Sequence, residues 1–187
     1  MSNNIKLVEV GPRDGLQNES TTLTVAERVS LIQALKEAGL STIEAGSFVS
    51  PKWVPQMAET DQVLQSLSGT LSDYPVLVPN QKGLTAALAA GAKNIAFFAS
   101  ATDRFSQKNI NCTTQESMDR FADLIQEAKD HGCTVRGYIS CVLGCPYEGA
   151  VSLTQVAQVA KQFYALGADE ISLGCLLYTS DAADDWF

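Results

Sequence analysis

The chain has 187 residues, of which 45% are hydrophobic and 18% charged, and its formal net charge is −8 at pH 7. This composition is typical of a globular protein and excludes a disordered chain. Because the charge is acidic and no stripe of Lys or Arg occurs, nucleic acid and membrane surfaces are not expected as partners, and no apolar run is long enough to span a bilayer.

The N-terminal segment and the cysteines indicate a cellular compartment. The polar start leads into an expected strand, which is not the pattern of a signal peptide. The five cysteines are an odd number, so we expect reduced thiols and no disulfide framework. Together these features predict a cytoplasmic protein.

Short β-rich runs alternate with longer amphipathic stretches along the chain. The expected strands cover residues 5–10, 42–46, 74–79, 94–100, 134–140 and 170–174. The expected helices cover residues 24–39, 55–67, 81–91, 114–132 and 153–167. The first helix begins with the spacing of a capping box, Thr24 followed by Glu27, and Gly39 ends it.

Three of these helices end in the same way, with Gly39, Gly91 or Gly167 followed by a short link and a strand. Such repeated links predict consecutive βα units in an α/β protein. The first strand lacks the Gly-x-Gly-x-x-Gly fingerprint of dinucleotide-binding folds, and polar loops, including residues 102–111, follow most strands. We therefore predict a (β/α)8 TIM-barrel type of fold, here truncated to about five βα units plus a sixth strand.

Charged residues follow the first strand and lie within the second. Arg13 and Asp14 are adjacent, and such a carboxylate can bind a hard cation while the guanidinium fixes an oxygen atom. Glu44 lies inside an expected strand, where a charge is unfavourable unless paired, and Arg13 is an available partner. Spacing alone leaves two interpretations open, a chemical site or a solvated turn with an ordinary ion pair.

A Cys-x-x-x-Cys pattern, Cys141 and Cys145, follows the fifth strand. This spacing differs from that of metal fingers and no second pair accompanies it, so we expect two small, buried packing residues. His131 is the single histidine, which excludes a site with several His ligands within these residues.

Several segments together resemble the 3-hydroxy-3-methylglutaryl-CoA lyase family of the DRE-TIM metallolyases, over residues 5–174. They are VEVGPRDGLQNE, IEAGSFVSPKWVPQM, YPVLVPN, KNINC, RGYISCVLGCPYEG and FYALGADEISLG. The Asp, Arg and Glu that give the superfamily its name match Asp14, Arg13 and Glu44. Related Claisen condensing enzymes and aldolases are the alternative, and the segment SFVSPKWVPQM favours the lyases.

The resemblance implies a carbon–carbon lyase that cleaves (S)-3-hydroxy-3-methylglutaryl-CoA to acetyl-CoA and acetoacetate with a divalent cation, Mg or Mn. It implies catalytic roles for Arg13, Asp14 and Glu44, with Asp14 as a metal ligand, and substrate binding by Arg13, Gln17 and Ser47. The implied partners are a small acyl-CoA substrate and, for full-length members, a second copy in a homodimer. Leucine catabolism and ketone body metabolism are the implied pathways.

The resemblance stops near residue 174. We expect residues 1–174 to be the N-terminal part of a lyase-like TIM barrel and residues 175–187 to be an unrelated, artefactual tail. The family's His-x-His pair, its late Asn and its catalytic Cys have no match in this sequence. We therefore expect this chain to be inactive as a fragment, and a catalytically silent half-barrel is the other possibility.

Overall fold

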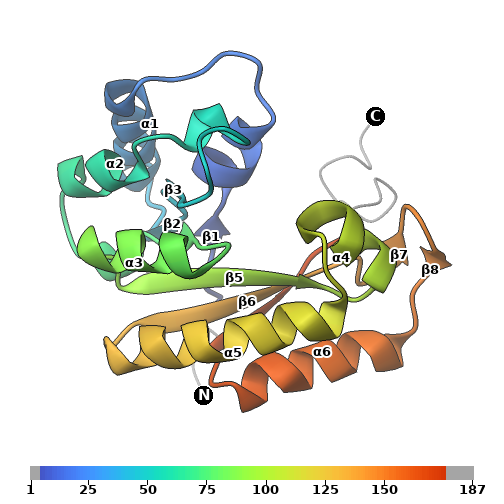
Figure 1. Cartoon of the computed structure of the whole chain (residues 1–187). Helices are drawn as coiled ribbons and strands as arrows, with labels where there is room; N and C mark the ends of the chain where they lie inside the picture. The colour runs from blue at the N-terminus through green and yellow to red at the C-terminus, as the bar shows by residue number, and fades with distance from the viewer. Residues whose placement is uncertain (1–4, 176–187) are drawn as a thin grey trace. The chain divides into compact units, whose positions relative to one another are not determined.

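The structure is a computed structural model that describes residues 5–175 (Figure 1). The chain divides into two compact units, Met1–Ile95 and Ala96–Phe187. The expected tail at 175–187 lies outside the described residues except for Cys175. Within the described part, no helix combines the length and the apolar character that a membrane crossing requires.

The first unit consists of short strands that alternate with helices or helical turns, except that β3 follows β2 directly. Its elements are β1 (Val8–Glu9), η1 (Gly11–Gly15), α1 (Val25–Glu37), β2 (Thr42–Ile43), β3 (Gly46–Ser47), η2 (Pro55–Met57), α2 (Thr60–Ser66), η3 (Leu71–Asp73), β4 (Val76–Leu77) and α3 (Gln81–Ala89). The strands form two parallel pairs, β1 with β2 and β3 with β4. Parallel pairing across intervening helices is the βα arrangement that the sequence predicts.

The expected strand at 42–46 is divided into β2 and β3 because the chain changes its hydrogen-bonding partner there. The Glu44 N–H donates to the Glu9 carbonyl at 2.8 Å, whereas the Ala45 N–H donates to the Pro75 carbonyl at 2.9 Å. One extended run therefore joins two neighbouring segments, and Glu44 is the residue at the change of partner.

The helix ends confirm the sequence signals. At the start of α1 the Glu27 N–H donates to Thr24 Oγ1, and Glu27 Oε2 accepts from the Thr24 N–H at 2.8 Å, which completes the capping box. The glycines after α1, α3 and the last helix have φ values of +103°, +82° and +98°, a left-handed conformation that glycine adopts without strain.

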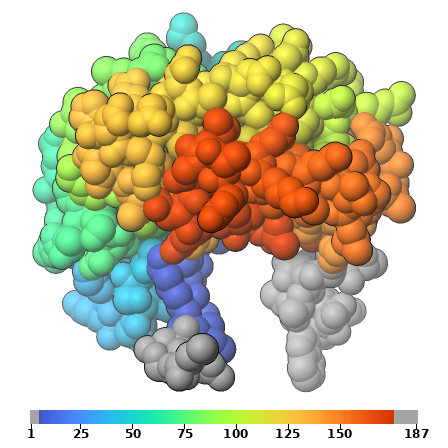
Figure 2. Space-filling view, turned by 90° about the horizontal axis from the view of Figure 1, so that it is seen from below, coloured from blue at the N-terminus to red at the C-terminus, as the bar shows by residue number. Residues whose placement is uncertain are grey.

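The second unit has longer strands. β5 (Asn94–Ser100) enters it and is followed by α4 (Asp103–Ile110), α5 (Thr114–Asp130), β6 (Thr134–Ser140), β7 (Gly144–Cys145), β8 (Gly149–Ala150), α6 (Leu153–Ala165) and β9 (Glu170–Leu173). β6 lies between β5 and β9, and β6 and β9 are parallel. Helices α5 and α6 lie side by side, and α6 forms part of the outer surface (Figures 1 and 2).

The core of the second unit includes the buried rings of Phe97, Phe121 and Phe163 among aliphatic side chains. Phe97 and Phe121 pack with their ring centroids 5.4 Å apart, and both are buried. Phe163 of α6 lies directly over Gly137 of β6, where a Cβ atom would meet ring carbons at 2.7 to 2.9 Å. Since no side chain fits at Gly137, helix α6 packs unusually close to the strand.

The sequence predicts a loop at 102–111, but the structure has helix α4 there, so this expectation is wrong. The segment is polar, and Ser106 is its buried residue. Its two apolar residues, Phe105 and Ile110, are half-buried, and two such positions in eight residues are too few to show a helical period in the sequence. Asn111 follows with a left-handed φ of +53° and ends the helix.

Candidate active site

A turn of π-helix, η1, follows β1 and carries two of the expected site residues. Pro12 lies in its first turn, and the N–H groups of Arg13 and Asp14 both donate to the Val10 carbonyl, at 3.0 and 2.6 Å. π-helical turns are rare and occur frequently at functional sites. The turn presents the guanidinium and the carboxylate next to the end of β1.

Arg13 bridges two carboxylates of different exposure. Its Nε and Nη2 atoms donate to Glu44 Oε2 at 3.1 and 3.0 Å, and its Nη1 atom donates to Asp14 Oδ1 at 2.6 Å. The side chain of Glu44 is 0% exposed, that of Arg13 11% and that of Asp14 59%. The guanidinium thus connects a buried acid to one that faces solvent.

This arrangement fixes a positive charge at the end of a strand. Two donors of Arg13 converge on one oxygen of Glu44, so the planar guanidinium has little freedom to rotate. Glu44 is itself held beside β1 by its backbone bond to Glu9. A fixed cation of this kind can stabilise an anionic oxygen atom without reorganisation during a reaction.

The other two expected substrate-binding residues lie in different surroundings. Gln17 is exposed just after the π-turn. Ser47 is buried on β3, which packs beside η1, and its hydroxyl donates to the Leu77 carbonyl and accepts from the Val49 N–H, both at 3.2 Å. The Ser47 hydroxyl therefore orders the backbone after β3 in this structure.

Asp14 suits a hard divalent cation, because it offers an exposed carboxylate oxygen. Between residues 5 and 175, however, no three His, Cys, Asp or Glu side chains come close enough to hold a metal ion together. The described residues therefore fit a metal as a single ligand and do not form a complete site.

A second buried arginine, Arg28 of α1, was not singled out from the sequence. Its Nη1 atom donates to the Ala58 carbonyl at 2.7 Å, and its Nη2 atom lies 3.1 Å from Thr60 Oγ1 and 3.4 Å from the Ala45 carbonyl. Burial lowers the pKa of Arg28, and the charge of Glu59 partly opposes this shift. Arg28 thereby links the segment after Glu44 to the start of α2.

Gly46 is the feature of the sequence that could have indicated the buried position of Arg28. A Cβ atom there would lie 2.7 Å from both Arg28 Nη2 and Thr60 Oγ1. The glycine is needed because the guanidinium occupies the space beside the strand. A lone arginine in an amphipathic helix, by contrast, is ordinarily interpreted as part of the solvated face.

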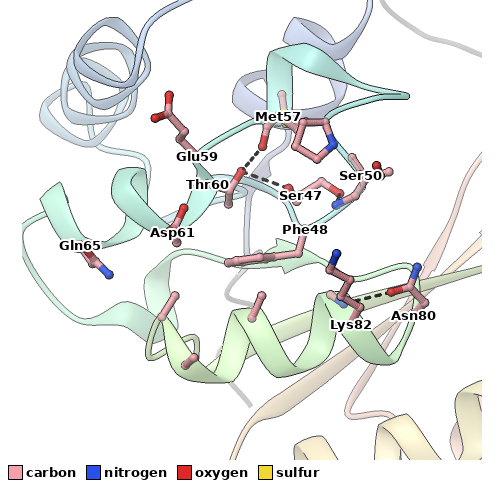
Figure 3. Close-up of a pocket in the computed structure, with 16 residues that line it drawn as sticks. Ser47, Phe48, Ser50, Met57, Glu59, Thr60, Asp61, Gln65, Asn80 and Lys82 are labelled. Atoms are coloured by element: carbon pink, nitrogen blue, oxygen red, sulfur yellow. Dashed lines mark hydrogen bonds between the residues drawn. The ribbon is translucent and has the colours of Figure 1, made fainter.

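A pocket of about 480 Å³ lies between the loop after β3, helix α2 and helix α3 (Figure 3). Ser47 and Phe48 line it from the loop, Asn80 and Lys82 from the start of α3, and Asp61 from α2. Its volume is in the range of small-molecule sites. Ser47 is thus the one expected substrate-binding residue that lies on its wall.

The fold and the site together describe an α/β protein with a parallel βα series and an Arg–Asp–Glu cluster at the ends of its first two strands. The model of the HMGL-like family matches residues 4–177, and the chain belongs to this family. The family comprises carbon–carbon lyases and is metal-dependent.

The relatives are named hydroxymethylglutaryl-CoA lyases. The mitochondrial enzyme of Macaca fascicularis is 54% identical over 171 residues, which cover 91% of this chain and 53% of that protein. The enzyme of Pseudomonas mevalonii is also 54% identical over 171 residues, covering 91% and 57%. The chain therefore spans about half the length of the curated relatives it matches.

Solved structures agree with these relatives. Hydroxymethylglutaryl-CoA lyase from Pseudomonas aeruginosa has a TM-score of 0.87 and 51% identity, covering 91% of this chain and 57% of that one. A lyase from Acinetobacter baumannii in complex with coenzyme A and 3-methylmalate has a TM-score of 0.83 and 33% identity, covering 90% and 56%. These neighbours confirm the predicted fold class, a partial TIM barrel with a parallel sheet.

The expected cytoplasmic location is wrong on the evidence of these comparisons. The relatives from Macaca fascicularis, Bos taurus and Homo sapiens are all named mitochondrial proteins. Composition and cysteine number separate oxidising from reducing compartments, but they do not distinguish between two reducing ones.

Proposed function

We propose that the protein is a hydroxymethylglutaryl-CoA lyase, which cleaves (S)-3-hydroxy-3-methylglutaryl-CoA to acetyl-CoA and acetoacetate. The observation that carries this proposal is the Arg13 bridge between buried Glu44 and exposed Asp14, in a chain 54% identical to named lyases. The coenzyme A complex of the Acinetobacter baumannii relative supports an acyl-CoA substrate.

In this proposal Arg13 stabilises the charge that appears as the carbon–carbon bond opens. Electrons of that bond pass to the thioester carbonyl, and its oxygen becomes an enolate oxygen. A guanidinium held rigidly by Glu44 gives more stabilisation to this anion than to the neutral ground state, which is the requirement for catalysis. Glu44 acts through Arg13 and is a positioning residue.

Asp14 is assigned to the tertiary hydroxyl and to the cation. As an exposed carboxylate beside Arg13, it can accept the hydroxyl proton or hold a divalent ion close to it. The cation, Mg or Mn, would supply Lewis-acid activation of that hydroxyl. Gln17 and Ser47 are assigned to substrate binding, Ser47 through the pocket that it lines.

Two further assignments belong to the same proposal. Residues 1–174 form the barrel portion, and residues 175–187 are an unrelated tail. The whole protein pairs with a second copy as a homodimer.

Because the described residues supply one metal ligand, and the family's later acid/base group has no match, this 187-residue chain alone lacks turnover. Loss of a general acid/base typically lowers the rate by roughly 10² to 10⁴.

The test is a coupled assay of acetyl-CoA release from the substrate with Mg or Mn. Sequencing the gene beyond the codon for Gly174 first shows whether the remaining half of the relatives' length follows in frame. The extended product is expected to be active, to lose activity in Asp14→Asn and to keep it in Asp123→Asn, which changes an exposed carboxylate of α5 that does not line the pocket. An active Asp14→Asn protein would contradict the assignment.

A further inference from the structure

The buried guanidinium of Arg28 contacts a segment that lies far from it in the sequence. The segment runs from Ser47 of β3 to Thr60 at the start of α2, and we call it the pocket loop. Arg28 Nη1 donates to the Ala58 carbonyl at 2.7 Å, and Nη2 donates to Thr60 Oγ1 at 3.1 Å. Because Arg28 is 1% exposed, these two bonds are shielded from water. One side chain of α1 therefore holds the end of the pocket loop.

Thr60 connects this end of the pocket loop to its start. The Thr60 hydroxyl lies 3.1 Å from the Ser47 carbonyl and 2.9 Å from the Met57 carbonyl, and it can donate its single hydrogen to either (Figure 3). The oxygen of the same hydroxyl accepts from Arg28. The two ends of the pocket loop thus meet beside the guanidinium, which is typical of compact, functional loops with closely spaced ends.

The acceptors of Arg28 are all uncharged oxygen atoms, which belong to Ala45, Ala58 and Thr60. Burial of a charge is costly, and an apolar side chain of similar volume often stabilises a protein as well or better. Stability alone therefore does not explain an arginine at this position. A planar guanidinium, unlike an apolar side chain, directs several donors at separate segments in a fixed geometry.

The pocket loop forms much of the wall of the 480 Å³ pocket. Of the 16 lining residues, eight belong to the segment 47–60, and they include Phe48 and Met57 (Figure 3). Arg28 is not itself a lining residue. Any effect of Arg28 on a ligand in the pocket must therefore pass through the pocket loop.

We propose that Arg28 is a positioning residue for the substrate pocket: it holds the two ends of the pocket loop together, and substrate affinity depends on it. This inference rests on the proposed function, in which Ser47 binds the acyl-CoA substrate through this pocket. Because Arg28 acts through the loop, its loss weakens binding of the substrate and of the transition state alike. A uniform loss of this kind raises KM and leaves kcat unchanged.

The first experiment measures amide hydrogen exchange in the ¹⁵N-labelled 187-residue chain. In Arg28→Met, the amides of Phe48 and Met57, which are hydrogen-bonded to Leu77 and Val54, are expected to exchange about tenfold faster than in the unaltered chain. The amide of Leu84, on α3 in the same unit, reports on global unfolding and is expected to change less. Arg28→Lys retains the charge but not the planar fork, so an intermediate effect is expected.

The second experiment compares kcat and KM in the extended product. Arg28→Met is expected to raise KM about tenfold and Arg28→Lys about threefold, with kcat within about twofold of the unaltered value. Lys36→Met is the matched control, because Lys36 also lies on α1 but donates to Asp73 and to the Tyr74 hydroxyl. It is expected to leave KM and the exchange of the pocket loop unchanged.

Three results would overturn the proposal. They are unaltered exchange of the pocket loop in folded Arg28→Lys and Arg28→Met, equal acceleration at Phe48 and Leu84, and a fall in kcat at constant KM. Equal acceleration would mean that Arg28 contributes to global stability alone. If the unaltered extended protein does not cleave the substrate, the proposed function fails, while the exchange experiment still decides whether Arg28 holds the pocket loop.

Discussion

The two compact units bury polar groups of different kinds. In residues 5–95 the buried charged side chains are Arg13, Arg28 and Glu44, all around the ends of β1 to β3. Over residues 96–175 the buried polar side chains are the hydroxyls of Ser100, Thr102, Ser106 and Ser117. The first unit thus buries charged groups beside its apolar core, which is expected where charge is needed for chemistry.

The same contrast is visible at two strand glycines. At Gly46 the guanidinium of Arg28 takes the space of a side chain, whereas at Gly137 the ring of Phe163 takes it. Both strands need a glycine, one for a polar link and the other for close apolar packing. At these two positions the first unit therefore packs a hydrogen-bonded charge against the strand, and the second packs an aromatic ring against it.

The largest expected effect comes from removing the buried acid. Glu44→Gln removes the buried negative charge that Arg13 contacts, while the Arg13 guanidinium stays mostly buried. The free energy of unfolding is therefore expected to fall by about 3 to 5 kcal/mol. Urea denaturation measures this change. The control is Glu170→Gln in the second unit: Glu170 pairs with Arg136 but is 38% exposed, and about 1 kcal/mol or less is expected. Equal losses in both variants would remove the distinction between the units.

The next largest effect is expected from overpacking the second unit at Gly137. Gly137→Ala is expected to lower the free energy of unfolding by about 3 kcal/mol, because the new Cβ meets a stiff, buried ring. Combining it with Phe163→Leu, which shortens the opposing side chain, should recover part of this loss. Thermal unfolding of the single and double variants checks the coupling, and strict additivity would contradict the packing explanation.

A smaller effect is expected at Gly46, the glycine that lies against Arg28 and Thr60. In Gly46→Ala the obstructing atoms belong to Arg28 and Thr60, which can shift at the expense of their hydrogen bonds, so about 2 kcal/mol is expected. The control is Gly15→Ala, where no atom lies within 4 Å of the added Cβ. Denaturant titration of the two variants provides the comparison. A larger loss for Gly15→Ala would be inconsistent with the role assigned to Arg28.

The smallest effect concerns the helix caps. Its dependence on pH distinguishes the cap of α1 from the cap of α6. Backbone and side-chain hydrogen bonds with Thr24 hold the pKa of Glu27 below its ordinary 4.5. Its contribution is therefore complete above pH 4.5 and is lost as the pH falls through the lowered pKa. Thr24→Ala should remove about 1 kcal/mol at neutral pH and return the pKa of Glu27 towards 4.5, which an NMR titration detects.

Ser152→Ala is the matched control for this prediction. The capping box of α6 pairs Ser152 with Gln155, which does not titrate. About 1 kcal/mol is again expected at neutral pH, but this loss should stay the same as the pH is lowered through the titration range of Glu27. If the loss of stability in Ser152→Ala also became smaller as the pH falls, the pH dependence seen in Thr24→Ala could not be assigned to the carboxylate of Glu27.

Local signals in the sequence account for much of the fold. The capping residues and the three glycine stops are local features, and the structure confirms them. The strands at 94–100 and 134–140 have the predicted bounds, because the first has a continuous apolar centre and the second alternates buried and more exposed residues. The change of partner at Glu44 and the helix α4 were not predictable, since the first depends on neighbouring strands and the second is a short segment with only two apolar residues.

The candidate site was predictable where a charge contradicted its local surroundings. Glu44 inside a strand required a partner, and the structure supplies Arg13. Arg28 gave no such contradiction, because an arginine on a helix normally faces solvent. The catalytic roles themselves remain predictions from the family resemblance.

The most direct test of the central claim, that Asp14 is the metal-binding acid beside a fixed Arg13, is to add Mn²⁺ to the ¹⁵N-labelled chain. Paramagnetic broadening of amide signals is expected to centre on Gly11–Gly15, with weak affinity because one carboxylate binds. The broadening should vanish in Asp14→Asn and persist in Asp123→Asn, which changes an exposed carboxylate of α5. Broadening centred elsewhere, or unchanged in Asp14→Asn, would contradict the account.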